Sequence, residues 1–325
     1  MIARNRRIKV NDDCNKRVNL DTYHLIRSGR AAFYEQKRGL IAIWGKEAVQ
    51  FLDGLVTNSV KTLEDGQQML AAFPDAKGRL IAVVRVLRAG DRFLFETEAA
   101  TRSVVHQNLF RFTFAGDFFV EDLSEAFVYF EMFGPKKDVY HADVGERFDG
   151  VFAFELPYGA GYFVPTGLAD KFREFLTMGD QNDCQPLDDE LYEVLRIEAG
   201  IPKYSVDMDE TTVVPELGLE GLVSYNKGCY IGQEIIARIH FRGHVAKQLT
   251  GVTLSETRPI GSVAPGSDLS TPDGKPAGKI TSTTYSPHLK RHIALAYVRY
   301  DYLAPGTELS VDGAPAIVTE LPFIE

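Results

Sequence analysis

A single cysteine stands in an octapeptide whose composition favours a reactive thiol. The stretch reads Lys-Gly-Cys-Tyr-Ile-Gly-Gln-Glu and covers residues 227–234. Cysteine reacts as the thiolate, which a nearby ammonium and the positive end of a helix both stabilise. Lys227 supplies the ammonium, and a helix is predicted over residues 232–239, just after Cys229. We therefore expect Cys229 to act as a reactive thiol, with Lys227 favouring its thiolate form.

Each residue of the octapeptide also has a structural interpretation. Cysteines of this kind are often small buried apolar residues, and a lysine beside a glycine is often a solvated surface cation. Gly228 and Gly232 suit a tight turn or the close approach of a partner. Gln233 and Glu234 could form the first turn of the helix, and with Tyr230 they could serve packing or an interface.

A second unusual residue is a carboxylate on an apolar helix face. Leu191, Val194 and Leu195 form a stripe at helical spacing. Glu198 continues this stripe in the last turn before Gly200, where its charge opposes the helix dipole and faces the interior. Because buried carboxylates are usually paired, we expect Glu198 to have a partner, either a cation or a backbone N–H.

The elements that position these residues follow from hydrophobic periodicity. Short runs rich in β-branched, aliphatic or aromatic residues predict strands over 40–44, 79–87, 92–97 and 127–133. Apolar residues at helical spacing predict helices over 46–60, 100–110 and 168–178. From residue 246, short runs over 249–254, 277–284, 292–299 and 316–321 alternate with Gly, Pro and Asp turns. Such spacing is typical of a small barrel or sandwich.

Size and charge narrow the class of protein. With 325 residues, 45% of them hydrophobic, the chain can bury a substantial core and is long for one domain. A net charge of −9 argues against non-specific electrostatic binding to nucleic acid, so no direct nucleic-acid binding is expected. No run of about 18 apolar residues occurs, so no membrane association is expected. Residues 1–20 are basic but lack the apolar core of a secretory signal, and we expect a mobile N-terminal arm.

Cysteine usage limits the metal chemistry. Cys14, Cys184 and Cys229 are far apart and form no CxxC pair, which is typical of a reducing compartment and predicts a cytoplasmic protein. A stable cubane iron–sulfur cluster normally takes four thiolates, so no stable metal site is expected, although Cys229 could contact a cluster transiently. His240 and His244 are expected in a loop or at a strand edge.

The octapeptide, continued by residues 237–238 and 241–243, resembles the signature of the YgfZ family. This family comprises folate-binding proteins implicated in iron–sulfur cluster assembly and repair. The resemblance extends over most of the chain from about residue 39. It is carried by Gly45, residues 51–52, 57–58, 75–79 and 195–202, Asp207 and residues 215–216.

The resemblance implies an α+β fold: a T-protein-like folate-binding region of two sub-lobes around a central hole over residues 21–245, then a C-terminal antiparallel β-barrel over 246–325. The T-protein of the glycine cleavage system, an aminomethyltransferase, shares this fold. The implied cofactor is tetrahydrofolate or a derivative. Glu198 would accept two hydrogen bonds from the amino-pyrimidine edge of the pterin, Tyr192 would stack on it, and Arg238 or Arg242 would bind the glutamate tail.

One departure separates the chain from the T-protein. Near Gly78 the transferase uses an aspartate, whereas Ile81 and Ala82 stand at the matching place here and Asp75 lies before the motif. We therefore expect an uncharged pocket, which does not suit ordinary aminomethyl transfer, and whether the chain is an enzyme is open. Three functions remain: a folate-binding factor for [4Fe–4S] assembly or repair in clients such as tRNA-methylthiolating radical enzymes, a folate-dependent aminomethyltransferase, or a non-catalytic adaptor. Iron–sulfur client or assembly proteins would be partners of an otherwise monomeric chain.

Overall fold

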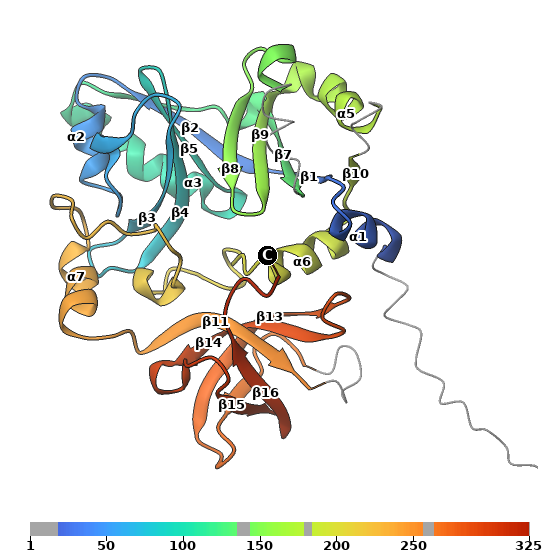
Figure 1. The fold of residues 1–325 in the computed structure, drawn as a ribbon. Coiled ribbons are helices and arrows are strands. Elements are labelled where there is room, and N and C mark those ends of the chain that lie inside the picture. The colour runs from blue at the N-terminus through green and yellow to red at the C-terminus, as the bar shows by residue number, and fades with distance from the viewer. Residues whose placement is uncertain (1–18, 135–143, 179–183, 256–262, 325) are drawn as a thin grey trace, which may run out of the picture.

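The strands of the described residues form two five-stranded sheets and a closed barrel (Figure 1). The computed structural model describes residues 19–134, 144–178, 184–255 and 263–324. The first sheet has the order β3 (Gln68–Pro74), β4 (Leu80–Ala89), β5 (Arg92–Glu98), β2 (Arg38–Trp44) and β6 (Phe119–Asp122). The second has the order β10 (Gln185–Pro186), β1 (Ala32–Gln36), β7 (Phe127–Phe133), β9 (Gly159–Pro165) and β8 (Phe152–Leu156). Neighbouring strands are antiparallel except β1 and β10.

The two sheets share an apolar interface. Leu40 and Leu94 of the first sheet belong to one buried cluster with Tyr129, Phe154 and Phe163 of the second. The helix α3 (Ala99–Phe110) packs on β2, β4 and β5, and α5 (Ala169–Thr177) packs on β9. Side chains of a strand alternate between its two faces, so each sheet can meet its helix with one face and other parts of the protein with the other.

The helix α6 (Asp189–Glu198) lies between the two sheets and the barrel. Asp188 caps its start by accepting a hydrogen bond from the backbone N–H of Leu191 at 2.8 Å. One face of α6 packs with α1 (Leu20–Arg27) in a buried cluster that includes Tyr23 and Leu195. Another packs on β13 and β14 of the barrel. Figure 1 shows α6 between the sheets and the barrel, so its side chains can reach all three parts.

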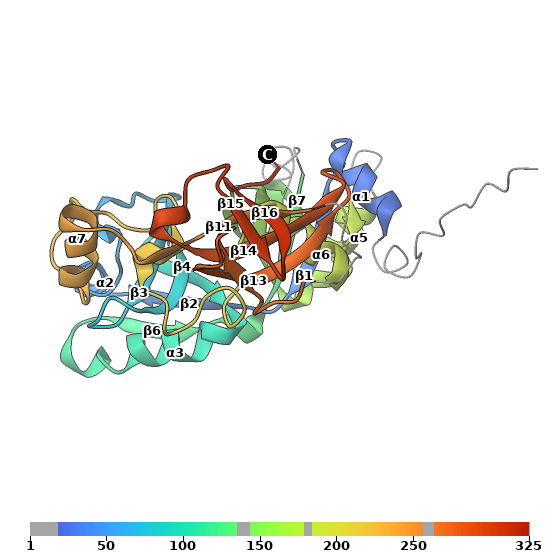
Figure 2. The same ribbon diagram turned by 90° about the horizontal axis from the view of Figure 1, so that it is seen from below.

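The C-terminal part is a closed six-stranded antiparallel barrel. Its strand order is β11 (Lys247–Leu254), β14 (Arg291–Arg299), β13 (Pro276–Ser286), β12 (Asp268–Ser270), β15 (Glu308–Val311) and β16 (Ala314–Thr319). Its core is made of small and branched apolar residues such as Val252, Ala296 and Val318. The predicted α+β class with a C-terminal antiparallel β-barrel is confirmed. Viewed from below, α7 (Gln233–Arg242) and α1 lie on opposite sides of this barrel (Figure 2).

Several predicted elements need correction. The helix predicted over 46–60 is only α2 (Ala48–Asp53), because residues 55–59 form a loop that hydrogen-bonds to other parts of the chain; a single 3₁₀ turn (Val60–Thr62) follows. Thr57, for example, donates to the carbonyl of Leu222 at 2.6 Å. The predicted helix over 232–239 runs instead from Gln233 to Arg242, so His240 is helical and not in a loop. Most of the predicted arm over 1–20 lies outside the described residues.

Candidate functional site

The octapeptide forms an exposed turn that leads into α7. Cys229 is exposed, and Gly232 begins the helix with a φ of +80°, a left-handed conformation that glycine adopts without strain. The N–H of Ile231 donates to the carbonyl of Gly54 at 3.1 Å. The turn is therefore tied to the loop that follows α2, and the Cys229 thiol faces solvent.

The ammonium of Lys227 is buried beneath this turn. Its side chain is only 1% exposed. It donates to the carbonyls of Asp53 at 2.7 Å, Val56 at 2.7 Å and Asn58 at 2.8 Å, and the Asp53 carboxylate lies 3.6 Å away. Lys227 is thus no solvated surface cation. Its donors are taken by the 53–58 loop, so its direct influence on the Cys229 thiolate stays a prediction.

Burial lowers the pKa of Lys227 to about 8, and the charge of Asp53 opposes this shift. The ammonium also lies 5.1 Å from the centre of the Tyr230 ring, which is itself buried. Lys227 and Tyr230 therefore serve packing and loop positioning under the exposed thiol.

The other motif residues lie on the surface of the same region. Gln233 donates to the carbonyl of Gly228 at 3.3 Å, and Glu234 is exposed in the first turn of α7. Arg238 and Arg242 are exposed on α7. Neither arginine lines the central cavity described next. Their binding of a glutamate tail stays a prediction that this arrangement does not support.

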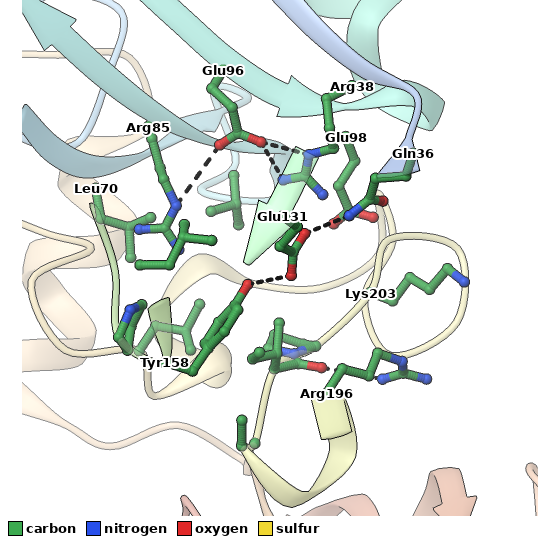
Figure 3. Close-up of a pocket in the computed structure, with 18 of the residues that line it drawn as sticks. Gln36, Arg38, Leu70, Arg85, Glu96, Glu98, Glu131, Tyr158, Arg196 and Lys203 are labelled. Carbon is green, nitrogen blue, oxygen red and sulfur yellow. Dashed lines mark hydrogen bonds and ion pairs between the residues drawn. The ribbon is translucent and has the colours of Figure 1, made fainter. Parts of the chain in front are cut away.

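The sheets, α6 and the 199–203 segment enclose a central cavity of about 340 Å³ (Figure 3). Its volume lies within the roughly 300–1,000 Å³ range of small-molecule sites. Tyr192 lines it and stacks on Tyr34, with ring centres 4.0 Å apart and planes 17° apart. Tyr192 thus lies where a planar ligand could reach it, although its ring already has an aromatic partner.

Two ion pairs and two further carboxyl groups give this cavity a strongly charged wall. Arg38 donates through Nε to Glu96 Oε1 at 2.6 Å and contacts the same oxygen through Nη2, while the Nε of Arg85 lies 3.8 Å from Glu96 Oε2. Glu98 and Glu131 also line the cavity. The expectation of an uncharged pocket is wrong, because charged residues stand on β2, β4, β5 and β7 even though Ile81 and Ala82 are apolar.

Of the two further carboxyl groups, Glu131 is buried and Glu98 is half-buried. Burial raises the pKa of Glu131, against the opposing charge of Arg38, and Tyr158 donates to it at 2.7 Å. Gln36 donates to its other oxygen. Burial likewise raises the pKa of Glu98, which accepts the backbone N–H of Tyr204 at 3.1 Å. Both groups can therefore hold or exchange a proton closer to neutral pH than an exposed carboxyl can.

The carboxylate of Glu198 faces the interior and is paired, as expected, but it does not line the cavity. Its exposed fraction is 0%, and it accepts hydrogen bonds from Tyr23 at 2.8 Å and Ser286 at 2.5 Å. Arg27 forms an ion pair with its second oxygen. Glu198 thereby joins α1, α6 and the barrel. A pterin contact would require these partners to move, so that role stays a prediction which this geometry does not support.

Sequence reasoning missed the charged wall of the cavity. Its residues are Arg38, Arg85, Glu96, Glu98 and Glu131. A signal was present: Glu96 and Glu98 stand two residues apart just after the apolar run of residues 93–95, so both point to one face of the strand. Charges at alternate positions of a largely buried strand mark a polar cavity or a paired network.

The fold is T-protein-like, and comparison with known proteins agrees. Residues 20–149 match the GCVT N-terminal domain, and residues 247–325 match the glycine cleavage T-protein C-terminal barrel domain. The glycine cleavage system aminomethyltransferase T from Bartonella henselae superposes with a TM-score of 0.81 at 22% identity, covering 94% of this chain and 89% of that one. This likeness establishes the fold.

Curated relatives carry different names. The chain is 26% identical to the putative transferase At1g60990, chloroplastic, of Arabidopsis thaliana, over 88% of this chain and 69% of the relative. It is 26% identical to an aminomethyltransferase of Pseudothermotoga lettingae, over 93% and 89%. It is also 28% identical to the tRNA-modifying protein YgfZ of Hamiltonella defensa, over 66% and 67%. No helix within the described ranges has the length and hydrophobicity to cross a membrane.

Proposed function

We propose that this chain binds tetrahydrofolate or a derivative and supports the assembly or repair of [4Fe–4S] clusters in client proteins such as tRNA-methylthiolating radical enzymes. The observation that carries the proposal is the exposed thiol of Cys229. It lies on a turn that Lys227 anchors to the 53–58 loop. The octapeptide resembles the YgfZ signature, and one relative is named a tRNA-modifying protein.

The central cavity suits the pteridine ring of such a cofactor. It offers carboxyl oxygens to N–H donors, a guanidinium to an electronegative atom, and the edge of Tyr192 to an aromatic ring. Tetrahydrofolate, when bound, would supply a carrier for one-carbon units. The chain's own residues would orient the ring and exclude water from it.

Cys229 would contact a client's cluster from outside the cavity. A cubane cluster normally needs four thiolates, and the buried position of Cys184 makes it a poor second ligand. The client or an assembly protein would therefore hold the cluster, and Cys229 would supply one transient sulfur ligand. Ile231, two residues after Cys229, is 36% exposed and offers apolar surface for such an encounter.

Complementation tests this proposal. Cells lacking the native homologue would receive the wild-type chain, Cys229→Ala, or the control Asn226→Ala, which alters an exposed residue of the same loop. We expect the wild type and the control to restore the activity of a [4Fe–4S] radical enzyme and Cys229→Ala to fail at equal protein levels. Restoration by Cys229→Ala would contradict the role of the thiol.

Aminomethyl transfer is the second candidate, favoured by the carboxyl groups in the cavity and by relatives named aminomethyltransferases. Because Ile81 and Ala82 carry no carboxyl group, an acid in this reaction would have to be a cavity residue such as Glu98 or Glu131. Formation of methylenetetrahydrofolate from a lipoate-carried aminomethyl group, lost in Glu131→Gln, would support this function over the first.

A further inference from the structure

One guanidinium in the central cavity has unused hydrogen-bond donors. Arg85 points into the cavity from β4 (Figure 3). Its Nε lies 3.8 Å from Glu96 Oε2, which is beyond hydrogen-bond distance. Its side chain is 21% exposed, and among the described residues it accounts for no hydrogen bond through its guanidinium. Arginine carries five N–H donors and stays charged, so these donors can serve a ligand.

The pairing of Glu96 explains why Arg85 is available. Arg85 and Glu96 are directly opposite on the antiparallel strands β4 and β5. Arg38, however, holds Glu96 through Oε1, with its Nε at 2.6 Å and its Nη2 also in contact with that oxygen, and Oε2 is the oxygen nearest Arg85. At 3.8 Å from Oε2, Arg85 keeps the attraction of the carboxylate without donating a hydrogen bond to it.

Acceptor groups face the same space. Glu131 and Glu98 line the cavity with Arg85, and the charge of Arg85 acts to lower the pKa of both Glu131 and Tyr158. Tyr158 and Gln36 each donate to a different oxygen of Glu131, so each oxygen keeps a second lone pair for a ligand N–H. Figure 3 shows Arg85 and Glu131 directed toward the same region, with the Tyr158 ring below them. The wall thus presents a donor group beside an acceptor group. A ligand that fits it carries an oxygen acceptor beside N–H donors on one edge.

We propose that Arg85 is the specificity-determining residue of the cavity and donates to the 4-carbonyl oxygen of a pteridine, while the neighbouring Glu131 accepts from the N–H groups of the same amino-pyrimidinone edge. This inference rests on the proposed folate binding and refines it. A glutamate-tail carboxylate is the other oxygen of folate that could pair with Arg85, and the experiment separates the two.

The test compares the affinities of two ligands for four proteins. Tetrahydrofolate and its 4-amino counterpart, tetrahydroaminopterin, differ in whether position 4 carries a carbonyl or an amine, and both keep the tail. Calorimetry would measure their binding to the full-length wild type, Arg85→Met, Arg85→Lys and the control Arg88→Met. Arg88 lies on the same strand, outside the cavity lining, and donates to the carbonyl of Gly90 at 3.0 Å.

We expect Arg85→Met to weaken tetrahydrofolate roughly 10-fold or more, the scale of a charge-assisted hydrogen bond, and to leave the 4-amino ligand unchanged. Arg85→Lys should lose less affinity for tetrahydrofolate than Arg85→Met does. Arg88→Met should bind it as the wild type does. Equal weakening of both ligands would assign Arg85 to the tail and overturn the inference, as would no weakening. If Arg85→Met does not fold, Arg85→Lys decides by the same comparison. A wild type that binds neither ligand would overturn the proposed folate binding itself.

Discussion

Gly232 packs directly against Gly78, so two motifs far apart in the chain form one structural unit. A Cβ placed on Gly232 would lie 3.2 Å from the Cα of Gly78 and 2.4 Å from the carbonyl oxygen of Asp75. The Asp75 carboxylate caps its own turn by accepting the N–H groups of Lys77 and Arg79 at 2.8 and 2.9 Å. The octapeptide thus owes part of its glycine content to this backbone contact.

Gly232→Ala should therefore destabilise the protein for two reasons. The left-handed backbone is strained for alanine, and the added Cβ collides with the 75–78 turn. Gly221 is the matched control, because its φ of +71° resembles the +80° of Gly232 but a Cβ there meets nothing within 4 Å. We expect Gly221→Ala to lower the free energy of unfolding by about 1 kcal/mol and Gly232→Ala by about 3 kcal/mol. Urea unfolding would measure both. Equal losses would show that the contact with the 75–78 turn adds nothing.

The buried Lys227 predicts a pH dependence of stability. Its pKa falls from 10.5 to about 8 on folding, because burial disfavours the ammonium. Between these pH values the unfolded chain binds more protons at this site than the native chain does. The contribution of Lys227 to the free energy of unfolding should therefore rise with pH across this window and stay constant below it.

The measurement is the difference in unfolding free energy between the wild type and Lys227→Met at several pH values. Lys61→Met is the control, since Lys61 also pairs with Asp53 but is 58% exposed. We expect Lys227→Met to be destabilised at every pH, because three carbonyls lose their donor. The difference should widen from pH 8 to 10.5. Lys61→Met should cost little stability, because an exposed ion pair contributes little. A difference that narrows in this window would refute the sign of the shift.

Replacing Glu198 should lower the stability of the protein without lowering its affinity for folate. Glu198→Gln keeps an acceptor for Tyr23 and Ser286 but removes the charge opposite Arg27. We expect a loss of about 3 kcal/mol in unfolding free energy, since a cation is left without its buried partner. Tetrahydrofolate affinity should stay within about twofold of the wild type, less than one hydrogen bond contributes. A selective tenfold loss of affinity would return Glu198 to the pterin site.

The two described cysteines should differ sharply in reactivity. Cys229 is exposed, whereas Cys184 is 2% exposed. In a Cys14→Ser background, iodoacetamide should modify Cys229 in the native protein and Cys184 only after unfolding. Mass spectrometry of peptides would locate the label, and Cys229→Ser gives the unlabelled reference. Native labelling of Cys184 at the same rate would contradict this assignment.

Much of the fold could be predicted because its local patterns agree with its tertiary structure. The strand expected over 127–133 coincides with β7, and those near 40–44 and 92–97 match β2 and β5 within a few residues. The stripe on α6 is buried as its spacing requires. Here the periodicity of the sequence and the packing of the protein demand the same conformation.

The site was harder to predict because its parts meet only in three dimensions. Lys227 reads as a surface residue until the 53–58 loop folds over it and offers three carbonyls. The family resemblance assigns Glu198 to a pterin pocket, and nothing local in the sequence reveals that Arg27 and Ser286 reach it. Long-range pairing of charges leaves no periodic trace, so sequence spacing gave the burial of Glu198 but not its partners.

The most direct test of the account is whether tetrahydrofolate occupies the central cavity. Equilibrium dialysis would compare the wild type with Val83→Trp, which fills the cavity that Val83 lines, and with Val104→Trp, which places the same bulk on the exposed side of α3. We predict saturable binding by the wild type and Val104→Trp and none by a folded Val83→Trp. Equal binding by all three would place the ligand elsewhere, and no binding by the wild type would contradict the folate-binding role.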